Sequence, residues 1–599
     1  MRLELQASSL LGVPLLRMRC HIDLEDQEAD WILDRHTWRY NEGVYGLRYF
    51  AQRWGCECGG WDVSLDSPGF STADAMRVNG TQVELGQGQP RNYGGPSIDF
   101  VYGESICFAL WRDESQPDAY IRATVQRGDT PECLAVTDQI WQQRSQSLSS
   151  PWLNLLVRIG PINRIDALNY WTRIYDYFGS RFRKAAGVPM PEPVPSLFLE
   201  SWNYGSGRFL KHQMAQLDEI ASRGITRLML HTLPHPHFER TCCALYDYTI
   251  LETEGGMKQL RLLTDEAKKR GMEVWGWSSG HLQVDAPLLK ENPDWIVRDE
   301  SGRVFDGGYP RELAALDFAH PGVQQWYINS LRDLYVKGGI AGFWIDSLMN
   351  LHAYGINAKR STGIGGPGPH LAGLLSCLRT LEREGLQFVT EGIGVIGLSA
   401  GNIGRGFLER TAATGNIDID ALGGGAELRY RTSLWWRGEV NKAGDGLDSD
   451  KYFEALAHAA PLVLWDDTTD GDDPSAPWLE TPVLEPVKFP GYADMNRAYA
   501  AVLPFMKVRE LLGDGSVLWH PESAASDDLS SDHTRGPEGV TGDRVLFQTH
   551  DGTVQLGQAY AGWQIIVVYG DAHATQVNQA GTVSVTRCSI LRITPPSRP

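Results

Sequence analysis

The fold of this chain is decided by the stretch Ile340-Ala-Gly-Phe-Trp-Ile-Asp346, a short apolar run that ends in a carboxylate. Runs of this length between turn residues are typical of strands buried in a parallel sheet. The preceding segment, Val323–Lys337, has the amphipathic periodicity of a helix, so the two segments form one unit of a helix–strand repeat. We therefore predict a buried parallel strand with Asp346 at its carboxyl end.

The same alternation of apolar strands and amphipathic helices runs outward from this stretch in both directions. The expected strands are Leu197–Glu200, Arg227–His231, Glu273–Trp277, Gly342–Asp346, Gln387–Glu391, Asn416–Asp420, Tyr430–Trp435 and Leu462–Asp466. The expected helices include Phe209–Arg223, Met257–Arg270, Val323–Lys337 and Leu371–Glu384, with Tyr492–Leu512 as the closing helix. Eight strands in this alternation predict an α/β fold of the (β/α)8 TIM-barrel type.

The sequence on both sides of the expected barrel has the pattern of short strands and turns that is typical of β-domains. A chain of 599 residues is long enough for two or three domains. Short strands such as Ser97–Tyr102, Tyr120–Val125 and Trp152–Val157 predict an N-terminal β-sandwich-like domain. A helical connector, Ile165–Ala186, leads from it into the Pro-rich link Val188–Pro195. Alternating segments near the end predict a small C-terminal β-domain, with strands Val545–Thr549, Trp563–Tyr569 and Val583–Arg587. We predict domains over residues 1–187, 188–512 and 513–599.

Composition excludes several classes of partner and location. The net charge is −19, from 55 Lys and Arg against 74 Asp and Glu, and this acidity argues against a nucleic-acid or anionic-membrane partner. The nine Cys form no paired CxxC framework. No basic segment followed by an apolar stretch opens the chain, and no apolar run is long enough to span a membrane. We expect a cytoplasmic protein with reduced thiols; its oligomeric state is left open.

Polar residues close most of the expected barrel strands, and the active site of a TIM barrel lies at those carboxyl ends. The residues in this position are Glu200, His231, Asp346, Glu391, Asp420, Asp466 and Asp467. Several carboxylates around one pocket suit the cleavage of glycosides. One ionised carboxylate attacks an oxocarbenium-like centre, while a second, kept protonated, donates a proton to the leaving oxygen.

Four ordered segments resemble one family of glycosidases. They are Gly271-Met-Glu-Val-Trp-Gly-Trp277, Glu291-Asn-Pro-Asp-Trp-Ile-Val-Arg298, Leu316-Asp-Phe-Ala-His-Pro-Gly-Val-Gln-Gln-Trp326 and Gly339-Ile-Ala-Gly-Phe-Trp-Ile-Asp346. The block is similar to the third- and fourth-strand region of the melibiase-type α-galactosidase clan, with its α-glucosidase and endo-α-N-acetylgalactosaminidase-like relatives. The resemblance spans roughly residues 196–470 and is dense over 271–350.

The resemblance implies a retaining glycoside hydrolase that acts on α-linked sugars, namely α-galactosides, α-N-acetylgalactosaminides or α-glucosides. Asp346 matches the family's nucleophile, which forms a covalent glycosyl-enzyme. Relatives differ in the acid/base residue, and three positions of this chain correspond to the alternatives. Glu391 ends the fifth strand, Glu439 follows a Trp-rich segment, and Asp420 ends the sixth strand. We favour Glu391, then Glu439, then Asp420.

Other residues near the strand ends are expected to bind the sugar. Asp466 and Asp467 can accept hydrogen bonds from sugar hydroxyls, or cap a turn. The indole rings of Trp202, Trp277 and Trp344 can stack on sugar rings, and burial inside the barrel is the competing interpretation, for Trp344 above all. Glu200, His231, Asp420 and Glu439 complete the expected substrate-binding set.

Alternatives from other classes stay open. The His residues of His231-Thr-Leu-Pro-His235-Pro-His237 could hold a metal in a metal-dependent barrel hydrolase, but no His closes the fourth to eighth strands, so we predict no metal. A transglycosylase of the same clan would use the same retaining mechanism. A non-catalytic carbohydrate-binding or regulatory barrel could bind glycans through the β-domains on both sides. The Gly-rich stretch Gly363–Pro369 does not open a helix after a strand, so we expect no nucleotide cofactor.

Overall fold

The structure is a computed structural model. Along the chain, a β-rich region precedes a parallel α/β region, and a second β-rich region follows it. The described residues are 2–10, 12–23, 31–40, 48–52, 63–64, 98–102, 106–112, 120–127, 134–143, 147–149, 152–163, 165–167, 169–170, 174, 198–201, 209–230, 233–236, 245–298, 303–304, 313–346, 368–390, 449–457, 464–466, 491–506, 508–521 and 542–596.

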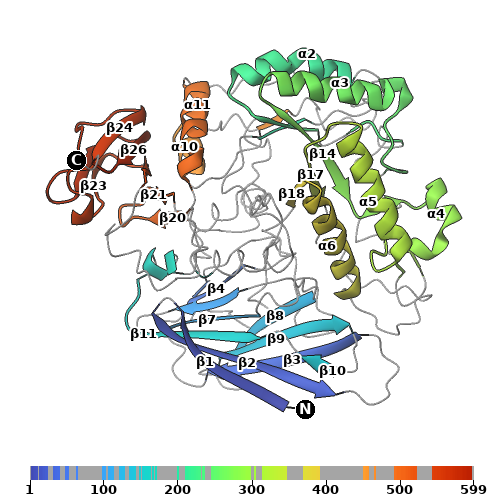
Figure 1. The fold of residues 1–599 in the computed structure, drawn as a ribbon, viewed down its shortest axis with the longest axis horizontal. Helices are drawn as coiled ribbons and strands as arrows, with labels where there is room; N and C mark the ends of the chain where they lie inside the picture. The colour runs from blue at the N-terminus through green and yellow to red at the C-terminus, as the bar shows by residue number, and fades with distance from the viewer. Residues whose placement is uncertain are drawn as a thin grey trace.

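Six parallel strands form the sheet of the α/β region (Figure 1). They are β12 (Phe198–Ser201), β13 (Arg227–Leu230), β14 (Glu273–Ser279), β17 (Gly342–Asp346), β18 (Gln387–Thr390) and β19 (Leu464–Asp466). Their order in the sheet is β18-β17-β14-β13-β12-β19. The last strand along the chain therefore pairs with the first, as the closure of a barrel requires.

This sheet confirms six of the eight expected barrel strands, within one or two residues at their ends. The other two, Asn416–Asp420 and Tyr430–Trp435, lie outside the described residues. The fold is a TIM barrel. The strand β14 continues two residues beyond the expected end, through Ser278 and Ser279, because hydrogen bonds satisfy these polar residues in a buried position.

The inner face of the sheet is identified by a contact between strands that are not neighbours. The guanidinium of Arg227 on β13 donates to Gln387 Oε1 on β18 at 3.2 Å, across the two intervening strands. It also pairs with Glu273 Oε2 at 2.9 Å and lies over the ring of Trp275. Side chains can meet across two intervening strands only on the concave face of the sheet, which is the inside of the barrel. These residues therefore lie in the barrel interior, near the amino ends of the strands.

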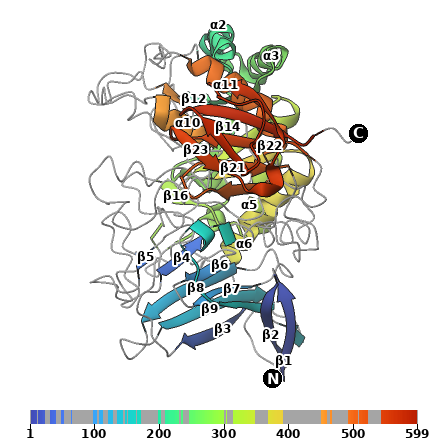
Figure 2. The same ribbon diagram turned by 90° about the vertical axis from the view of Figure 1, so that its left-hand side faces the viewer.

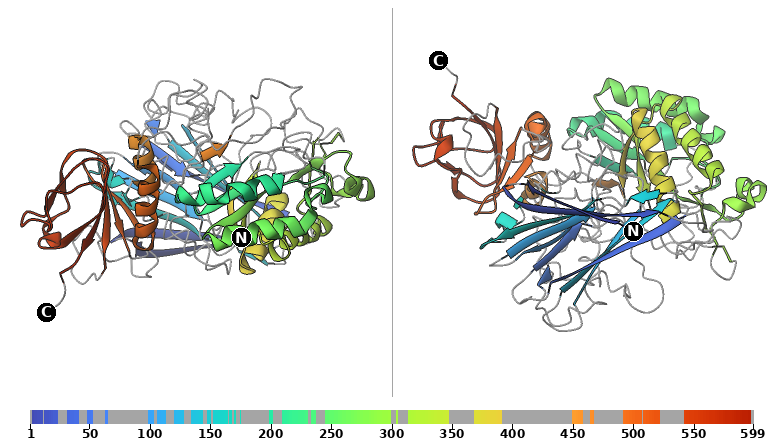
Figure 3. Two further views of the ribbon diagram at one scale, coloured as in Figure 1. Left: turned by 90° about the horizontal axis from the view of Figure 1, so that it is seen from above. Right: turned by 60° about the horizontal axis from the view of Figure 1, so that its bottom comes forward.

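Helices cover the outside of the sheet, and their bounds agree closely with the expected ones. The principal helices are α2 (Phe209–Ser222), α3 (Gly256–Lys269), α5 (Pro321–Val336) and α6 (Gly368–Arg383), with the shorter α4 (Pro287–Glu291) and α10 (Ser449–Ala457). In α3, Leu260, Leu263 and Ala267 recur at helical spacing and are fully buried. The helices α2 and α3 lie side by side, as do α5 and α6 (Figure 1; Figure 3).

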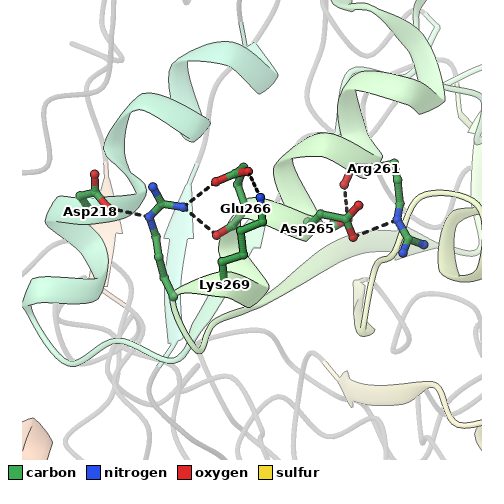
Figure 4. A network of polar contacts seen from close by, with 7 residues as sticks. Asp218, Arg261, Asp265, Glu266 and Lys269 are labelled. Atoms are coloured by element: carbon green, nitrogen blue, oxygen red, sulfur yellow. Dashed lines mark hydrogen bonds and ion pairs between the residues drawn. The ribbon is translucent and has the colours of Figure 1, made fainter.

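Surface ion pairs lie along α3, and one of them joins it to α2 (Figure 4). Arg270, which follows α3, donates to Asp218 Oδ1 at 2.6 Å and to Glu266 Oε2 at 3.0 Å. Lys269 pairs with the same Glu266, and Arg261 pairs with Asp265 within α3. Exposed pairs of this kind contribute at most about 1 kcal/mol each, so the buried face of α3 holds the helix in place.

The expected closing helix Tyr492–Leu512 is shorter than predicted. The helix α11 covers Tyr492–Val502, a single 3-10 turn follows over Leu503–Phe505, and β20 begins at Val508. Pro504 explains the difference, since proline has no N–H to donate and its ring clashes with the preceding turn of an α-helix. Residues 508–511 therefore belong to the C-terminal sheet.

The N-terminal region contains two antiparallel sheets (blue to cyan in Figure 1 and Figure 2). An eight-stranded sheet contains β1 (Arg2–Leu10), β2 (Val13–Asp23), β4 (Arg48–Gln52), β5 (Val63–Ser64), β6 (Ile98–Tyr102), β7 (Ile106–Arg112), β10 (Ser147–Ser149) and β11 (Leu153–Ile159). A three-stranded sheet contains β3 (Trp31–Tyr40), β8 (Tyr120–Arg127) and β9 (Leu134–Gln143). In the expected connector helix, the described residues 165–167, 169–170 and 174 are helical.

The C-terminal strands form a sheet whose inner strand β22 is buried on both faces, whereas the edge strand β24 is partly exposed (orange to red in Figure 1). The five-stranded sheet contains β20 (Val508–Leu511), β21 (Val517–His520), β22 (Arg544–Gln548), β24 (Gln564–Tyr569) and β26 (Ser589–Thr594), and a pair contains β23 (Gly552–Gln555) and β25 (Thr582–Val585). Phe547 contacts rings of α10 and α11, whereas its neighbour Leu546 belongs to a separate C-terminal core. Within the described part of the chain, no helix is long and apolar enough to cross a membrane.

Candidate active site

The carboxyl ends of β14, β17 and β18 lie next to one another and define the candidate site. Asp346 is the last residue of β17, and its Cα is in register with that of Ser279, the last residue of β14. On the other side, Ile345 is in register with Thr390, the last residue of β18. A short antiparallel hairpin, β15 (His281–Gln283) with β16 (Leu313–Ala315), follows β14 directly.

A buried hydrogen-bond network holds the end of β14. Tyr248, in the loop after β13, places its hydroxyl 2.8 Å from Ser278 Oγ and 2.7 Å from the carbonyl oxygen of Ser279. The same hydroxyl accepts a bond of 3.1 Å from the Ser279 amide. Ser278 Oγ in turn lies 2.8 Å from the hydroxyl of Tyr327 on α5. All four residues are buried.

The direction of each hydrogen bond in this network follows from its chemistry. A carbonyl oxygen can only accept, so the single proton of the Tyr248 hydroxyl goes to Ser279. Ser278 must therefore donate to Tyr248, and Tyr327 must donate to Ser278. Burial raises the pKa of the Tyr327 hydroxyl well above its usual value, and the nearby Tyr248 adds to this shift. The Tyr327 hydroxyl therefore stays protonated, as the network requires.

His235 is buried close to this network in its neutral form. Its Nδ1 donates to the carbonyl oxygen of Thr249 at 2.8 Å, and its ring meets the Tyr248 ring edge-on at 5.4 Å between centroids. Burial lowers the pKa of His235 to about 4, against smaller raising effects of the Thr249 hydrogen bond and of Asp247. Because Nδ1 carries the proton, Nε2 is an acceptor, and it has no hydrogen-bond partner among the described residues.

Trp277 lies inside the protein, where its ring offers no exposed face for stacking. It lies two residues before the end of β14, in the main hydrophobic core, and is fully buried. It shares its side of the strand with Trp275, whose ring contacts Arg227 on the inner face. Of the two interpretations that the sequence allowed for this tryptophan, the structure shows burial inside the barrel.

The remaining expected site residues fall into two groups. The backbone of Glu200, Trp344, Asp346 and Asp466 lies in β12, β17 and β19, and Ser201 next to Glu200 is in register with Asp466. The register of β12 and β19 thus brings these strand ends together. Six residues lie outside the described residues, namely Trp202, His231, Glu391, Asp420, Glu439 and Asp467.

Tyr248, Ser278 and Ser279 were not among the residues expected at the site. The sequence gives a weak signal for the two serines, because two small polar residues follow the apolar strand Glu273–Trp277 directly. It gives none for Tyr248, which lies 30 residues from Ser278 along the chain. In the parts of the chain that the structure describes, no three His, Cys, Asp or Glu side chains gather closely enough to hold a metal ion.

Residues 247–364 match the family model of the "Glycosyl hydrolases family 31 TIM-barrel domain". This segment includes Tyr248, the whole of β14 and β17, and Asp346. It is less than half of the chain, so the match describes a likeness of this part of the barrel. No curated protein matches the chain in sequence.

Solved structures share the fold along nearly the whole chain. The alpha-galactosidase from Lactobacillus brevis matches with a TM-score of 0.55 and 11% identity, over 100% of this chain and 86% of that one. A variant of the GH36 alpha-galactosidase AgaA from Geobacillus stearothermophilus, in complex with raffinose, matches with a TM-score of 0.56 and 11% identity, over 99% and 81%. AgaB from the same organism gives 0.56 and 11%, over 99% and 80%.

At this level of identity the structural likeness concerns the fold. The fold and the matched barrel segment together support a glycoside hydrolase with a TIM-barrel catalytic domain. The expected resemblance to the α-galactosidase clan and its relatives is thereby confirmed at the level of the fold.

Proposed function

We propose that this protein is a retaining glycoside hydrolase that cleaves α-linked sugars by double displacement, with Asp346 as the nucleophile. One observation carries the proposal: Asp346 is the last residue of a parallel barrel strand, inside the segment that matches a glycoside hydrolase barrel. Catalytic residues of TIM barrels come from strand ends at this face. An ionised carboxylate there attacks the anomeric carbon, and water then releases the sugar with its configuration retained.

For the acid/base residue we propose Glu391, with Glu439 and Asp420 as the next candidates. The support for Glu391 is its sequence position directly after Thr390, the last residue of β18, which is the neighbour of β17 in the sheet. A protonated Glu donates to the leaving oxygen in the first step, and its carboxylate activates water in the second. Retaining enzymes require two carboxyl groups at about 5–5.5 Å, which adjacent strand ends can provide.

We further propose that the sugar is held by Glu200, Trp202, His231, Trp344, Asp466 and Asp467, with Asp420 and Glu439 where they are not the acid/base. Their support is their place at or just after the carboxyl ends of barrel strands in the sequence. One of the similar solved structures is an alpha-galactosidase in complex with raffinose. An α-galactoside is therefore the first substrate to test, followed by α-glucosides and α-N-acetylgalactosaminides.

The nucleophile is tested with aryl α-glycosides of these three sugars. Asp346→Asn should lower kcat on the order of 10⁴-fold or more, because an amide cannot form the glycosyl-enzyme. The matched control is Asp333→Asn on α5, which removes the same charge from an exposed ion pair with Lys337, directly after the helix, and should keep wild-type kcat. Proton NMR of the first-formed product should show the α-anomer. Full activity of Asp346→Asn, or inversion of configuration, would contradict the proposal.

The acid/base assignment is tested by the dependence on the leaving group. Glu391→Gln should lose activity on glycosides with poor leaving groups, while activated aryl glycosides keep most of theirs, because good leaving groups need little proton donation. An equal loss on both kinds of substrate would assign the role to Glu439 or Asp420. The same two substrates then test Glu439→Gln and Asp420→Asn.

The domain organisation and the location are proposals as well. We propose an N-terminal β-sandwich-like domain over residues 1–187, the catalytic barrel from 188, and a C-terminal β-domain that begins with β20 at Val508 instead of 513, since β20 pairs with β21. A cytoplasmic location is supported by the free thiols of Cys107, Cys377 and Cys588. Thiol titration of the unreduced, denatured protein should find nine free cysteines, and fewer would contradict this location.

A further inference from the structure

Among the described residues, the end of β14 has no strand partner on its β13 edge. The backbone of Glu273 bonds toward the β13 side, because its amide donates to the carbonyl oxygen of Thr226 at 2.9 Å. Backbone groups of alternate residues point to the same edge of a strand, so Ser279 also presents its amide and carbonyl toward β13. The register between β13 and β14 ends at Met229 with Trp275. Ser279 therefore extends past the strand that would have paired with it.

The Tyr248 hydroxyl takes the place of the missing strand. It donates to the Ser279 carbonyl at 2.7 Å and accepts from the Ser279 amide at 3.1 Å, so one side-chain atom satisfies both backbone groups. The third contact, from Ser278, ties the hydroxyl to Tyr327 on α5. Buried backbone groups without partners are costly, so this hydroxyl fixes the position of the strand end.

We propose that Tyr248 is a positioning residue for the glycosidase reaction: its hydroxyl holds Ser279 at the end of β14, and β14 pairs with β17, whose neighbouring end carries Asp346. This inference rests on the proposed function. The link between the two strand ends is the sheet register, in which Ser279 and Asp346 are direct partners. A displacement of about 1 Å at a reacting group can cost about 100-fold in rate, so a small movement of β14 is sufficient to slow catalysis.

The chain offers a matched control for the test of Tyr248. Tyr248→Phe removes the hydroxyl that holds the Ser279 amide and carbonyl. Tyr327→Phe removes an equally buried phenol hydroxyl of the same network, yet leaves both contacts between Tyr248 and Ser279 in place. A purely structural role predicts similar effects of the two substitutions, whereas a positioning role predicts different ones.

The experiment measures kcat and KM per folded protein on the aryl α-glycoside that the wild type cleaves best. It also measures amide hydrogen exchange of the peptide covering residues 273–283. Tyr248→Phe should lower kcat by about 10- to 100-fold with KM little changed, since the strand end moves and not the sugar contacts. Exchange at Ser279 should become about tenfold faster or more, because its amide loses its acceptor. Tyr327→Phe should stay within about threefold of wild type in kcat.

The outcomes separate this inference from the proposed function. Equal losses of kcat in Tyr248→Phe and Tyr327→Phe would overturn the positioning role, and so would unchanged exchange at Ser279 in Tyr248→Phe. If the wild type cleaves the substrate and Asp346→Asn does not, the proposed function stands whichever way Tyr248 behaves. A wild type without glycosidase activity overturns the proposed function and the catalytic part of this inference, while the exchange measurement still decides whether Tyr248 holds the strand.

Discussion

Single residues in the barrel couple its stability to pH, and His235 is the clearest case. Burial holds its pKa at about 4 in the folded protein, whereas an unfolded histidine titrates near its ordinary value of about 6.5. Between these two values the unfolded chain binds a proton that the folded chain does not. The free energy of unfolding should therefore fall by about 3 kcal/mol as the pH falls from about 6.5 to about 4.

His235→Asn tests this contribution by urea unfolding over the same pH range. The amide nitrogen of Asn can replace Nδ1 as the donor to Thr249 O but does not titrate. The variant should start from a lower stability, because a small cavity remains, and should lose about 3 kcal/mol less than the wild type between pH 6.5 and pH 4. The same pH slope in both proteins would show that other groups cause the acid sensitivity.

The role of a single residue could be predicted only where its signal lies in a short stretch of sequence. Asp346 stands out because it ends an apolar run, and that pattern is visible within seven residues of sequence. The role of Tyr248 depends on partners 30 and 31 residues away, and a single sequence contains no record of such pairs. Trp277 could be either a stacking platform or a core residue, because both uses place an indole near the end of a barrel strand.

At the scale of elements, apolar strands and amphipathic helices were predictable because each follows its own periodicity. The errors arose where a nonlocal contact or a single residue overrides that periodicity. Ser278 and Ser279 extend β14 because Tyr248 and Tyr327 satisfy them. The helix that begins at Tyr492 ends early because Pro504 interrupts it.

The buried Arg227 joins three barrel strands, and this predicts a stability effect. Glu273→Gln keeps acceptors for Arg227 and Trp275 but removes the negative charge beside a guanidinium that is 7% exposed. Because the Glu273 side chain is itself 42% exposed, we expect a loss of about 1–2 kcal/mol, below the cost of breaking a fully buried pair. Urea unfolding at pH 7 measures this change.

A surface pair provides the comparison for Glu273→Gln. Glu219→Gln on α2 breaks an ion pair with Arg223, directly after the helix. The Glu219 side chain is 59% exposed, so the loss should be less than about 0.5 kcal/mol. Equal effects of the two substitutions would mean that burial of Arg227 does not strengthen its ion pair. Neither residue lies at the carboxyl ends of the strands, so kcat should not change in either variant.

At the scale of the whole molecule, the C-terminal sheet is attached to the barrel through one face. Phe547 is fully buried between Phe453 of α10 and Tyr499 of α11, and Trp519 donates to the carbonyl of Ala457 at 2.8 Å. The other face, with Leu546, packs on β23 and β25 in a core of its own. Because side chains alternate along a strand, Phe547 lies at the interface with the barrel and Leu546 lies in the C-terminal core. Truncating the two residues should therefore affect the cooperativity of unfolding differently.

Phe547→Ala should weaken the attachment, and Leu546→Ala should weaken the C-terminal core alone. Each truncation costs about 2–5 kcal/mol, because each leaves a cavity in a buried site. Calorimetry should find one main transition in the wild type and in Leu546→Ala, at a lower temperature in the variant. In Phe547→Ala the C-terminal strands should unfold separately from the barrel, because the contacts that couple the two are lost. Identical calorimetric profiles for the two variants would show that the sheet and the barrel unfold as one body, whichever face is damaged.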